Sequence, residues 1–174
     1  EGGRYTYGDV HYVKQAGELV PAAETEFAQD KTFGYRHSQL PQYIEEKTDG
    51  VYRAEDVVCI PLADLRDCAF EKIEQMLLEV DGFRKICVNA VDYYDVKVFA
   101  IALYRAMRKG KRFLFRTAAS FVKVMGGIAD RPLLTRQELL PGNPANGGLV
   151  VVGSHTQKTT AQLEKLLELE TVES

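Results

Sequence analysis

From residue 56 onward, short apolar runs alternate with longer stretches that carry apolar side chains at helical spacing. The runs Val57–Ile60, Ile86–Asn89, Arg112–Phe115 and Leu149–Val152 are predicted strands. Strands that alternate with helices form right-handed crossovers and pair in parallel. The sequence therefore predicts an α/β fold with three layers: a mostly parallel sheet with helices on both faces.

The stretches between these strands predict four helices. They span Asp67–Val80, Tyr93–Lys109, Thr117–Met125 and Thr159–Leu169. Asp67 is expected to cap the first helix, since Asp is a preferred residue at helix N-termini. The second helix is expected to end at Gly110, because glycine adopts the left-handed conformation that terminates helices.

The first 55 residues differ from this core. Val10–Val13 and Glu18–Pro21 are predicted to form a hairpin, and Leu40–Lys47 a helix with Ser38 as its cap and Pro41 in its first turn. The core is therefore preceded by a small hairpin-containing segment. We expect residues 1–174 to form a single domain, with an irregular hairpin and helix segment over 1–55 and a βα core over 56–174.

Composition excludes several classes of partner. The chain has 22 Lys and Arg against 25 Asp and Glu, a formal net charge of −3, so nucleic acid is not an expected partner. No apolar stretch approaches the roughly 20 residues of a membrane span and we expect no signal peptide, so no membrane partner is expected either. Cys59, Cys68 and Cys87 are odd in number and lack metal-ligand spacing, which favours a cytoplasmic location and no metal site.

Ligands of parallel α/β sheets bind beyond the carboxyl ends of the strands. The polar residues in these places are Asp64, Asn89, Asp92, Asp95, Arg116, Thr117, Ser120, Ser154, His155 and Thr156. Arg116 offers a planar fork for a carboxylate or phosphate, and Asn89 and Asp92 offer acceptors for sugar hydroxyls. The alternative is that Arg116 and Asp92 form a structural ion pair and that Asp92 or Asp95 caps the next helix.

The segment Gly147–Leu163 combines an apolar run with a Gly-Ser turn and several hydroxyls. Ser154 and Thr156 stand where the N–H groups of the following helix lie unpaired, a place that suits an anion or a sugar hydroxyl. The alternative is that these hydroxyls simply cap the helix. No phosphate-binding glycine-rich motif follows any predicted strand, so a self-contained nucleotide site is not expected.

Several segments together resemble the four-carbon acid sugar kinase family, in order and spacing along nearly the whole chain. They are Gly3-Arg-Tyr-Thr-Tyr-Gly-Asp-Val-His-Tyr-Val13, Val20-Pro-Ala-Ala-Glu-Thr-Glu-Phe-Ala-Gln-Asp30, Phe33-Gly-Tyr-Arg-His-Ser38, Val88-Asn-Ala90, Arg116-Thr-Ala-Ala-Ser-Phe-Val122, and Gly153-Ser154 with Thr159 and Gln162. The resemblance implies ATP-dependent phosphorylation of a threonate or 3-oxo-tetronate type of acid, with ATP and Mg²⁺ as cofactors of the full-length protein.

The resemblance covers the later part of the family's sugar-acid-binding N-terminal domain. The family's leading Asp-Asp motif and its C-terminal nucleotide domain do not appear in this sequence. The resemblance thus implies that the partners are a small sugar acid and the missing N- and C-terminal segments of the same protein. Whether this chain is itself an enzyme stays open, and we expect no phosphoryl transfer from it alone.

The resemblance also assigns roles to individual positions. Arg4 and Thr6 match an element near the acid-sugar pocket, Arg116 and Ser120 match a segment facing the same cleft, and Ser154 matches a nucleotide-contacting turn. The resulting expectation is a substrate site of Arg4, Thr6, Asn89, Asp92, Arg116 and Ser120, and a cofactor site of Ser154 and His155. His155 departs from the small or hydroxyl residues that the family has there. A non-catalytic sugar-acid-binding or regulatory module is the alternative function.

Overall fold

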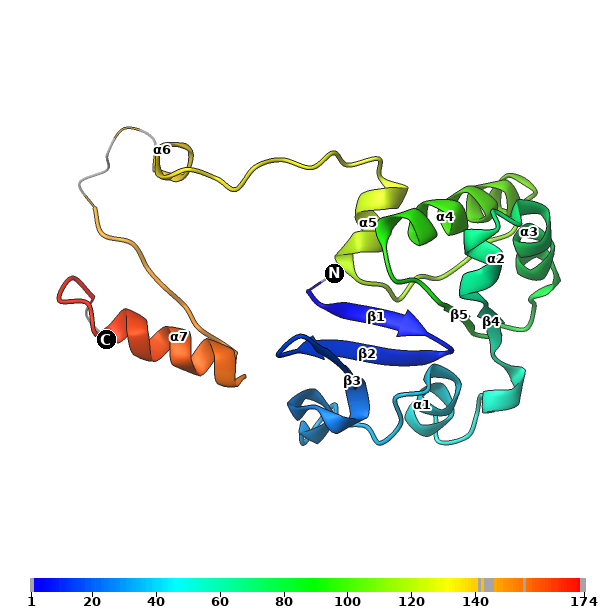
Figure 1. Cartoon of the computed structure of the whole chain (residues 1–174), viewed down its shortest axis with the longest axis horizontal. Coiled ribbons are helices and arrows are strands. Elements are labelled where there is room, and N and C mark those ends of the chain that lie inside the picture. Colours follow the sequence, from blue (N-terminus) through cyan, green and yellow to red (C-terminus); the bar gives the residue numbers. More distant parts are fainter. Residues whose placement is uncertain (1, 141, 143–145, 155, 173–174) are drawn as a thin grey trace. The chain divides into compact units, whose positions relative to one another are not determined.

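The structure is a computed structural model that describes residues 2–140, 142, 146–154 and 156–172. Its internal contacts divide the chain into two compact units, residues 1–129 and residues 130–174, and each unit is described by itself (Figure 1). Compact units need not fold independently, so a single domain over residues 1–174 stays a prediction.

The first unit begins with an antiparallel sheet of three strands, β1 (Arg4–Tyr7), β2 (Val10–Gln15) and β3 (Glu18–Pro21), in the order β1-β2-β3. The predicted hairpin is confirmed as β2 and β3. Its turn residues, Ala16 and Gly17, both have positive φ, at 49° and 94°, as a tight two-residue hairpin turn requires.

Short helical segments follow the sheet: the 3₁₀ turns η1 (Ala22–Glu24) and η2 (Glu26–Gln29), helix α1 (Leu40–Lys47) and the 3₁₀ turn η3 (Ala54–Asp56). The bounds of α1 and the place of Pro41 in its first turn are confirmed. Ser38 is not its cap. The Ser38 hydroxyl instead accepts a hydrogen bond from the Ala23 backbone N–H at 2.8 Å, which fixes the loop before α1.

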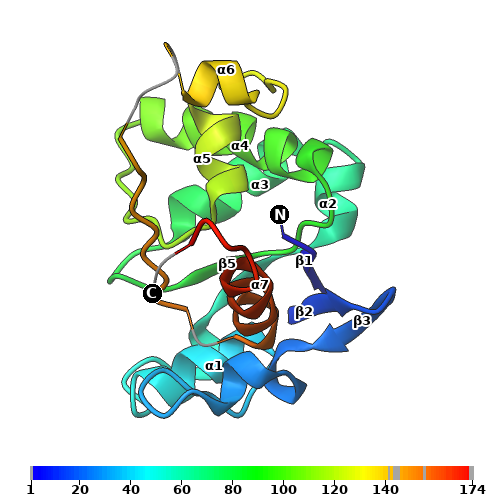
Figure 2. The same cartoon turned by 90° about the vertical axis from the view of Figure 1, so that its left-hand side faces the viewer.

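The core of the first unit contains a two-stranded parallel sheet, β4 (Val58–Ile60) and β5 (Ile86–Val88), with Cys59 opposite Cys87. Three helices belong with it: α2 (Leu62–Arg66), α3 (Phe70–Glu79) and α4 (Tyr93–Arg108). Figures 1 and 2 agree in placing α3 and α4 on one side of these strands and α1 on the other.

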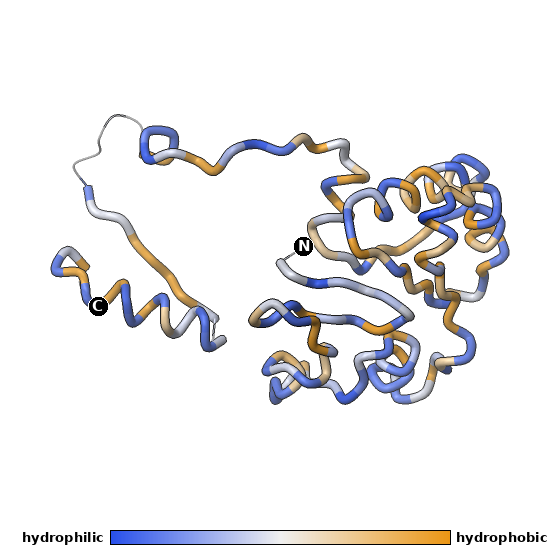
Figure 3. The backbone as a smooth tube through the Cα atoms, viewed as in Figure 1, coloured by the Kyte–Doolittle hydropathy of each residue, from blue (hydrophilic) through white to orange (hydrophobic). Residues whose placement is uncertain are grey.

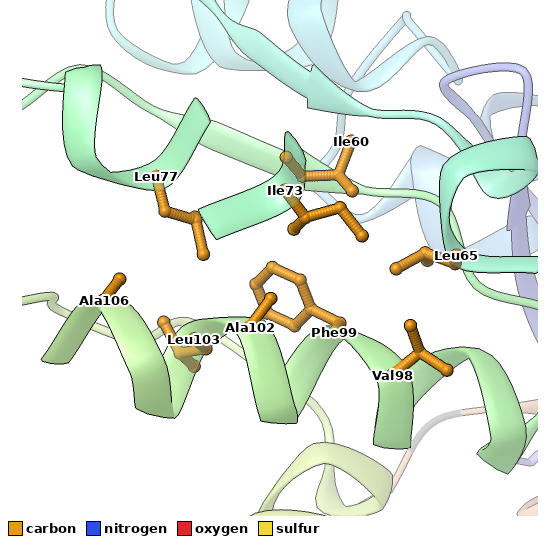
Figure 4. Packing of buried hydrophobic residues seen from close by; sticks show 9 residues of the cluster. All are labelled: Ile60, Leu65, Ile73, Leu77, Val98, Phe99, Ala102, Leu103 and Ala106. Carbon is orange, nitrogen blue, oxygen red and sulfur yellow. The ribbon is translucent and has the colours of Figure 1, made fainter. Parts of the chain in front are cut away.

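The main hydrophobic cluster lies between β4 and the helices α2, α3 and α4 (Figure 4). It consists of Ile60, Leu65, Ile73, Leu77, Val98, Phe99, Ala102, Leu103 and Ala106. Several of these side chains have no exposed surface, so the apolar stripes that predicted α3 and α4 are the surfaces that these helices bury.

The antiparallel and parallel sheets meet near the carboxyl end of β5. The Thr6 backbone N–H donates to the Ala90 carbonyl at 3.1 Å, and these two residues form an antiparallel bridge. Beyond α4, an irregular segment leads to helix α5 (Ala119–Met125), which contacts α4. The Tyr104 hydroxyl on α4 donates to the Met125 carbonyl at 2.5 Å, which ties the end of α5 to α4.

The second unit contains two helices, α6 (Arg136–Leu139) and α7 (Gln157–Leu167). The run Leu149–Val152 is one continuous hydrophobic stretch in Figure 3, and its side chains are mostly exposed, from 40% to 89%. Thr135 caps α6 with a reciprocal bond to Glu138, which stabilises this short helix in a segment rich in proline and glycine.

The α/β class and the hairpin-containing first segment are confirmed, but two predicted strands are wrong. Neither Arg112–Phe115 nor Leu149–Val152 is a strand, because neither pairs with a neighbouring strand within the described residues. A strand needs a hydrogen-bonding neighbour, which apolar and β-branched composition cannot supply. Asp67 is also not a helix N-cap: it ends α2, and α3 begins three residues later, after Cys68 with φ of 51°.

Candidate functional site

The first part of the site lies on the hairpin of β1 and β2. Arg4 and Thr6 are two positions apart on β1, so their side chains lie on the same face of the sheet. Thr6 pairs with His11 on β2. The Thr6 hydroxyl and His11 Nδ1 are 3.0 Å apart. Burial lowers the pKa of His11, and the positive charge of Arg4 lowers it further. His11 is therefore neutral at pH 7 and lies beside the Thr6 hydroxyl.

The second part is an aromatic cluster that holds Arg116. Arg116 Nη2 donates to the Tyr43 hydroxyl at 3.2 Å, and its guanidinium lies 5.7 Å from the centroid of the Tyr43 ring. Tyr43 packs edge to face on Tyr35, with ring centroids 5.4 Å apart. Burial raises the pKa of Tyr35, and Tyr43 adds to this increase, while the Arg4 charge acts in the opposite direction. Arg116 thus contacts Tyr43, which in turn packs on Tyr35.

Arg4 is held by an aromatic ring in the same way as Arg116. Its guanidinium carbon lies 5.0 Å from the centroid of the Phe27 ring. The two arginines are linked through the backbone, because the Tyr35 N–H donates to the carbonyl of Ala28, the residue after Phe27. We call Arg4, Phe27, Tyr35, Tyr43 and Arg116 the arginine–aromatic cluster. Within residues 2–140, 142, 146–154 and 156–172, no carboxylate forms an ion pair with Arg4 or Arg116. Two guanidinium groups without an anionic partner can receive an anion, and aromatic faces suit the C–H surface of a small carbohydrate.

Asn89 is buried at the end of the parallel sheet, with 2% of its surface exposed. Its side-chain nitrogen donates to Asp9 Oδ1 at 2.7 Å and to the Ile60 carbonyl at 3.0 Å, and its oxygen accepts from the Asp9 N–H at 2.8 Å. Both amide hydrogens are thus in use. Asn89 clamps the turn between β1 and β2 to the end of the parallel sheet, and it leaves no donor for a ligand.

Asp92 is the N-cap of α4. Its side chain accepts from the N–H groups of Tyr94 and Asp95, which completes a capping box with Asp95. The Asp95 N–H is the largest cause of the low pKa of Asp92, and Arg66 contributes further. Arg66 Nη2 lies 2.9 Å from Asp92 Oδ2, and Arg66 also pairs with the buried Asp95. The expected cap is confirmed, and the partner of Asp92 is Arg66 rather than Arg116.

The remaining predicted residues lie elsewhere. Ser120 is half-buried on α5. In the second unit, Thr156 caps α7 and accepts from the Thr159 N–H, and the exposed Ser154 hydroxyl lies 3.4 Å from that of Thr156. His155 lies outside the described residues. The capping alternative therefore accounts for Thr156, whereas a nucleotide contact at Ser154 and His155 stays a prediction.

Sequence reasoning missed the three aromatic residues of the cluster. Phe27, Tyr35 and Tyr43 stand on a 3₁₀ turn, a loop and a helix, and no local spacing connects them. The available signal was indirect, because Phe27 and Tyr35 fall inside segments that carry the family resemblance.

In the described residues, no group of three or more His, Cys, Asp or Glu can hold a metal ion. No helix in this part of the chain is long and apolar enough to span a membrane.

These features define a mixed α/β domain that presents two arginines on aromatic rings. The model of the family described as "Sugar-binding N-terminal domain" matches residues 1–125. The chain therefore belongs to this family, which confirms the resemblance to the N-terminal domain of four-carbon acid sugar kinases. The matched residues include the whole arginine–aromatic cluster.

The comparison with solved structures shows a more distant similarity. A crystal structure of Haemophilus influenzae protein HI1011, from the family DUF1537, is similar to this chain with 19% sequence identity and a TM-score of 0.45. The similarity covers 64% of this chain and 29% of that one, so the chain spans less than a third of the length of HI1011. No curated protein matches the sequence.

Proposed function

We propose that this chain is the sugar-acid-binding part of an ATP-dependent kinase that phosphorylates a four-carbon acid sugar of the threonate or 3-oxo-tetronate type. The observation that carries the proposal is that Arg4 and Arg116, 112 positions apart in the chain, each have a guanidinium on a ring of this cluster and no carboxylate partner among the described residues. An acid sugar has the matching chemistry: a carboxylate for the guanidinium groups and hydroxyls for neighbouring polar side chains.

The predicted substrate residues take different roles in this proposal. Arg4 and Arg116 bind the carboxylate, and Thr6, beside Arg4 on β1, binds a hydroxyl. Asn89 acts as a positioning residue, since its amide holds the turn that follows β1. Asp92 and Ser120 are proposed to line the more distant part of the site, from the starts of α4 and α5.

ATP and Mg²⁺ enter this proposal only through the longer protein. The described residues offer no cluster of carboxylates for a magnesium ion, and Ser154, proposed to contact the nucleotide, is held near a helix cap. No step of phosphoryl transfer is therefore derived from these residues. The proposal keeps the cytoplasmic location that the cysteine content favours.

The longer protein also bears on the architecture of the parallel sheet. We propose that further strands of the longer protein extend the parallel pair β4 and β5 into a three-layer, mostly parallel sheet with helices on both faces. The two parallel strands β4 and β5 support this proposal, since a sheet of only two strands is marginal by itself.

Calorimetric titration of the 174-residue chain with threonate tests the binding proposal. We expect Arg116→Ala and Arg4→Ala each to weaken binding by about 1–3 kcal/mol, because each removes a charge-assisted hydrogen bond. Arg108→Ala is the matched control, since Arg108 is an exposed arginine on α4 outside the cluster. Equal losses in all three variants would show a general charge effect and contradict the assigned site.

A second measurement separates the kinase from the alternative, a non-catalytic binding or regulatory module. The chain alone, mixed with ATP, Mg²⁺ and threonate, is expected to transfer no phosphoryl group. A longer protein that restores the segments on both sides is expected to turn over the acid. A restored protein that binds threonate but consumes no ATP would favour the module.

A further inference from the structure

We propose that Tyr43 is a positioning residue that sets the direction of the Arg116 guanidinium at the sugar-acid site. This inference rests on the proposed function for its ligand, but the contacts that carry it belong to the protein alone. Tyr43 acts through Arg116 and does not itself touch the acid.

Arg116 needs such a residue because of its place in the fold. Arg116 lies in the irregular segment between α4 and α5, where no helix or strand fixes the backbone direction. It is also exposed. An exposed arginine loses considerable rotamer entropy when it binds a ligand. A contact that orders the guanidinium before binding reduces this cost.

Tyr43 supplies two contacts of the required kind. Its hydroxyl accepts a hydrogen bond from Arg116 Nη2 at 3.2 Å, and its ring centroid lies 5.7 Å from the guanidinium carbon. A guanidinium has five N–H donors in a rigid plane, so one hydrogen bond together with the ring contact restricts the orientation of that plane and leaves other donors for a carboxylate.

Tyr43 is in turn fixed by its neighbours. It is half-buried on α1 and packs edge to face on Tyr35, with an interplanar angle of 84°. Tyr35 is anchored at both ends, because its hydroxyl donates to the Ala22 carbonyl at 3.3 Å and its backbone N–H donates to the Ala28 carbonyl at 3.1 Å. A continuous series of contacts therefore runs from the backbone around η1 and η2 to the guanidinium of Arg116.

A double-mutant cycle on the 174-residue chain tests the inference. Tyr43→Phe removes only the hydroxyl, and we expect it to weaken threonate binding about threefold, less than the full loss of a hydrogen bond to a charged group, because Arg116 itself remains. In an Arg116→Ala background, Tyr43→Phe is expected to have no effect, because Tyr43 acts only through that arginine. Tyr52→Phe is the matched control: Tyr52 is also half-buried and has a cation over its ring, Lys85, but lies outside the cluster.

Nuclear magnetic resonance gives a readout that needs no ligand. In the free chain, the Nε–Hε signal of Arg116 is expected to shift and to show faster motion after Tyr43→Phe, with no change after Tyr52→Phe. An unchanged Arg116 signal would overturn the inference, whether or not the acid binds. A Tyr43→Phe effect of equal size in the Arg116→Ala background would also overturn it.

The two proposals fail in different ways. If the wild-type chain binds no sugar acid while Tyr43→Phe still releases the Arg116 signal, the proposed function is wrong and the positioning role stands. If threonate binds through Arg116 but Tyr43→Phe changes neither affinity nor signal, the positioning role is wrong and the proposed function stands.

Discussion

Asn89 connects two parts of the first unit that are far apart in the sequence. Asn89→Ala removes the three side-chain bonds to Asp9 and Ile60 and leaves the Asp9 N–H without this partner. We expect a loss of about 1–3 kcal/mol in the free energy of unfolding, the cost of leaving buried polar groups unsatisfied. Urea denaturation followed by circular dichroism measures it.

Gln42→Ala is the control for this prediction, because Gln42 is an exposed residue on α1. Its substitution is expected to change the stability by less than about 0.5 kcal/mol. A similar loss in both variants would mean that Asn89 has no special structural role.

Cys59 and Cys87 give the protein a pH dependence on the alkaline side. They are partners in the parallel sheet, and burial is the largest cause that raises the pKa of each thiol to about 12. The folded state therefore disfavours the thiolate. The contribution of these two thiols to stability is fully present below the ordinary thiol pKa of about 9, and it is lost as the pH rises toward 12.

Urea denaturation at a series of pH values from 7 to about 11 checks this pH dependence. The double variant Cys59→Ala/Cys87→Ala is expected to lose part of the alkaline decline. Some decline remains in that variant, since burial also raises the pKa of Tyr35. An identical alkaline decline in wild type and double variant would contradict the assignment to the thiols.

Among the elements, α4 has the strongest start signal. Asp92→Ala removes a side chain that accepts from two backbone N–H groups, so we expect a loss of about 0.5–2 kcal/mol. Asp92→Asn keeps a capping oxygen and removes the charge beside Arg66, so its loss is expected to be smaller. Hydrogen exchange of the backbone amides in the first turn of α4 is measured in both variants. An unchanged exchange rate in Asp92→Ala would contradict the capping role.

Elements with a local cause were predictable from the sequence. The turn at Ala16-Gly17 and the apolar stripe of α4 are properties of neighbouring residues, and both are in the structure. Arg112–Phe115 and Leu149–Val152 have strand composition but depend on a distant partner that sequence does not reveal. Strand β1 was missed because its alternation of polar and aromatic residues covers only four positions, and its pairing with β2 makes it a strand.

At the scale of the whole molecule, stability depends on the cluster between β4 and the helices. Leu77 has no exposed surface there, so Leu77→Ala is expected to cost about 2–5 kcal/mol. Leu133, 95% exposed in the second unit, is the matched control and is expected to tolerate the same substitution. Thermal and urea denaturation of the two variants compare them directly, and equal effects would place the core elsewhere.

The sequence also predicted part of the candidate site. Sequence and family resemblance selected Arg4, Thr6 and Arg116, and the structure places Arg4 on the Phe27 ring and Arg116 on the Tyr43 ring. They did not show that the amide of Asn89 is fully bonded, because Asp9 and Asn89 meet only in the folded molecule. Residue type indicates which chemistry is available, while burial and bonding decide which groups remain free for a ligand.

The clamp between Asp9 and Asn89 also constrains the order of folding. The two residues are 80 positions apart, so their bonds close a long loop and carry its entropic cost. The hairpins of the antiparallel sheet need only neighbouring residues and form on the microsecond scale. Their attachment to the parallel sheet requires β5, because Asn89 directly follows that strand. We therefore expect the N-terminal hairpins to form early and to dock on the parallel sheet late.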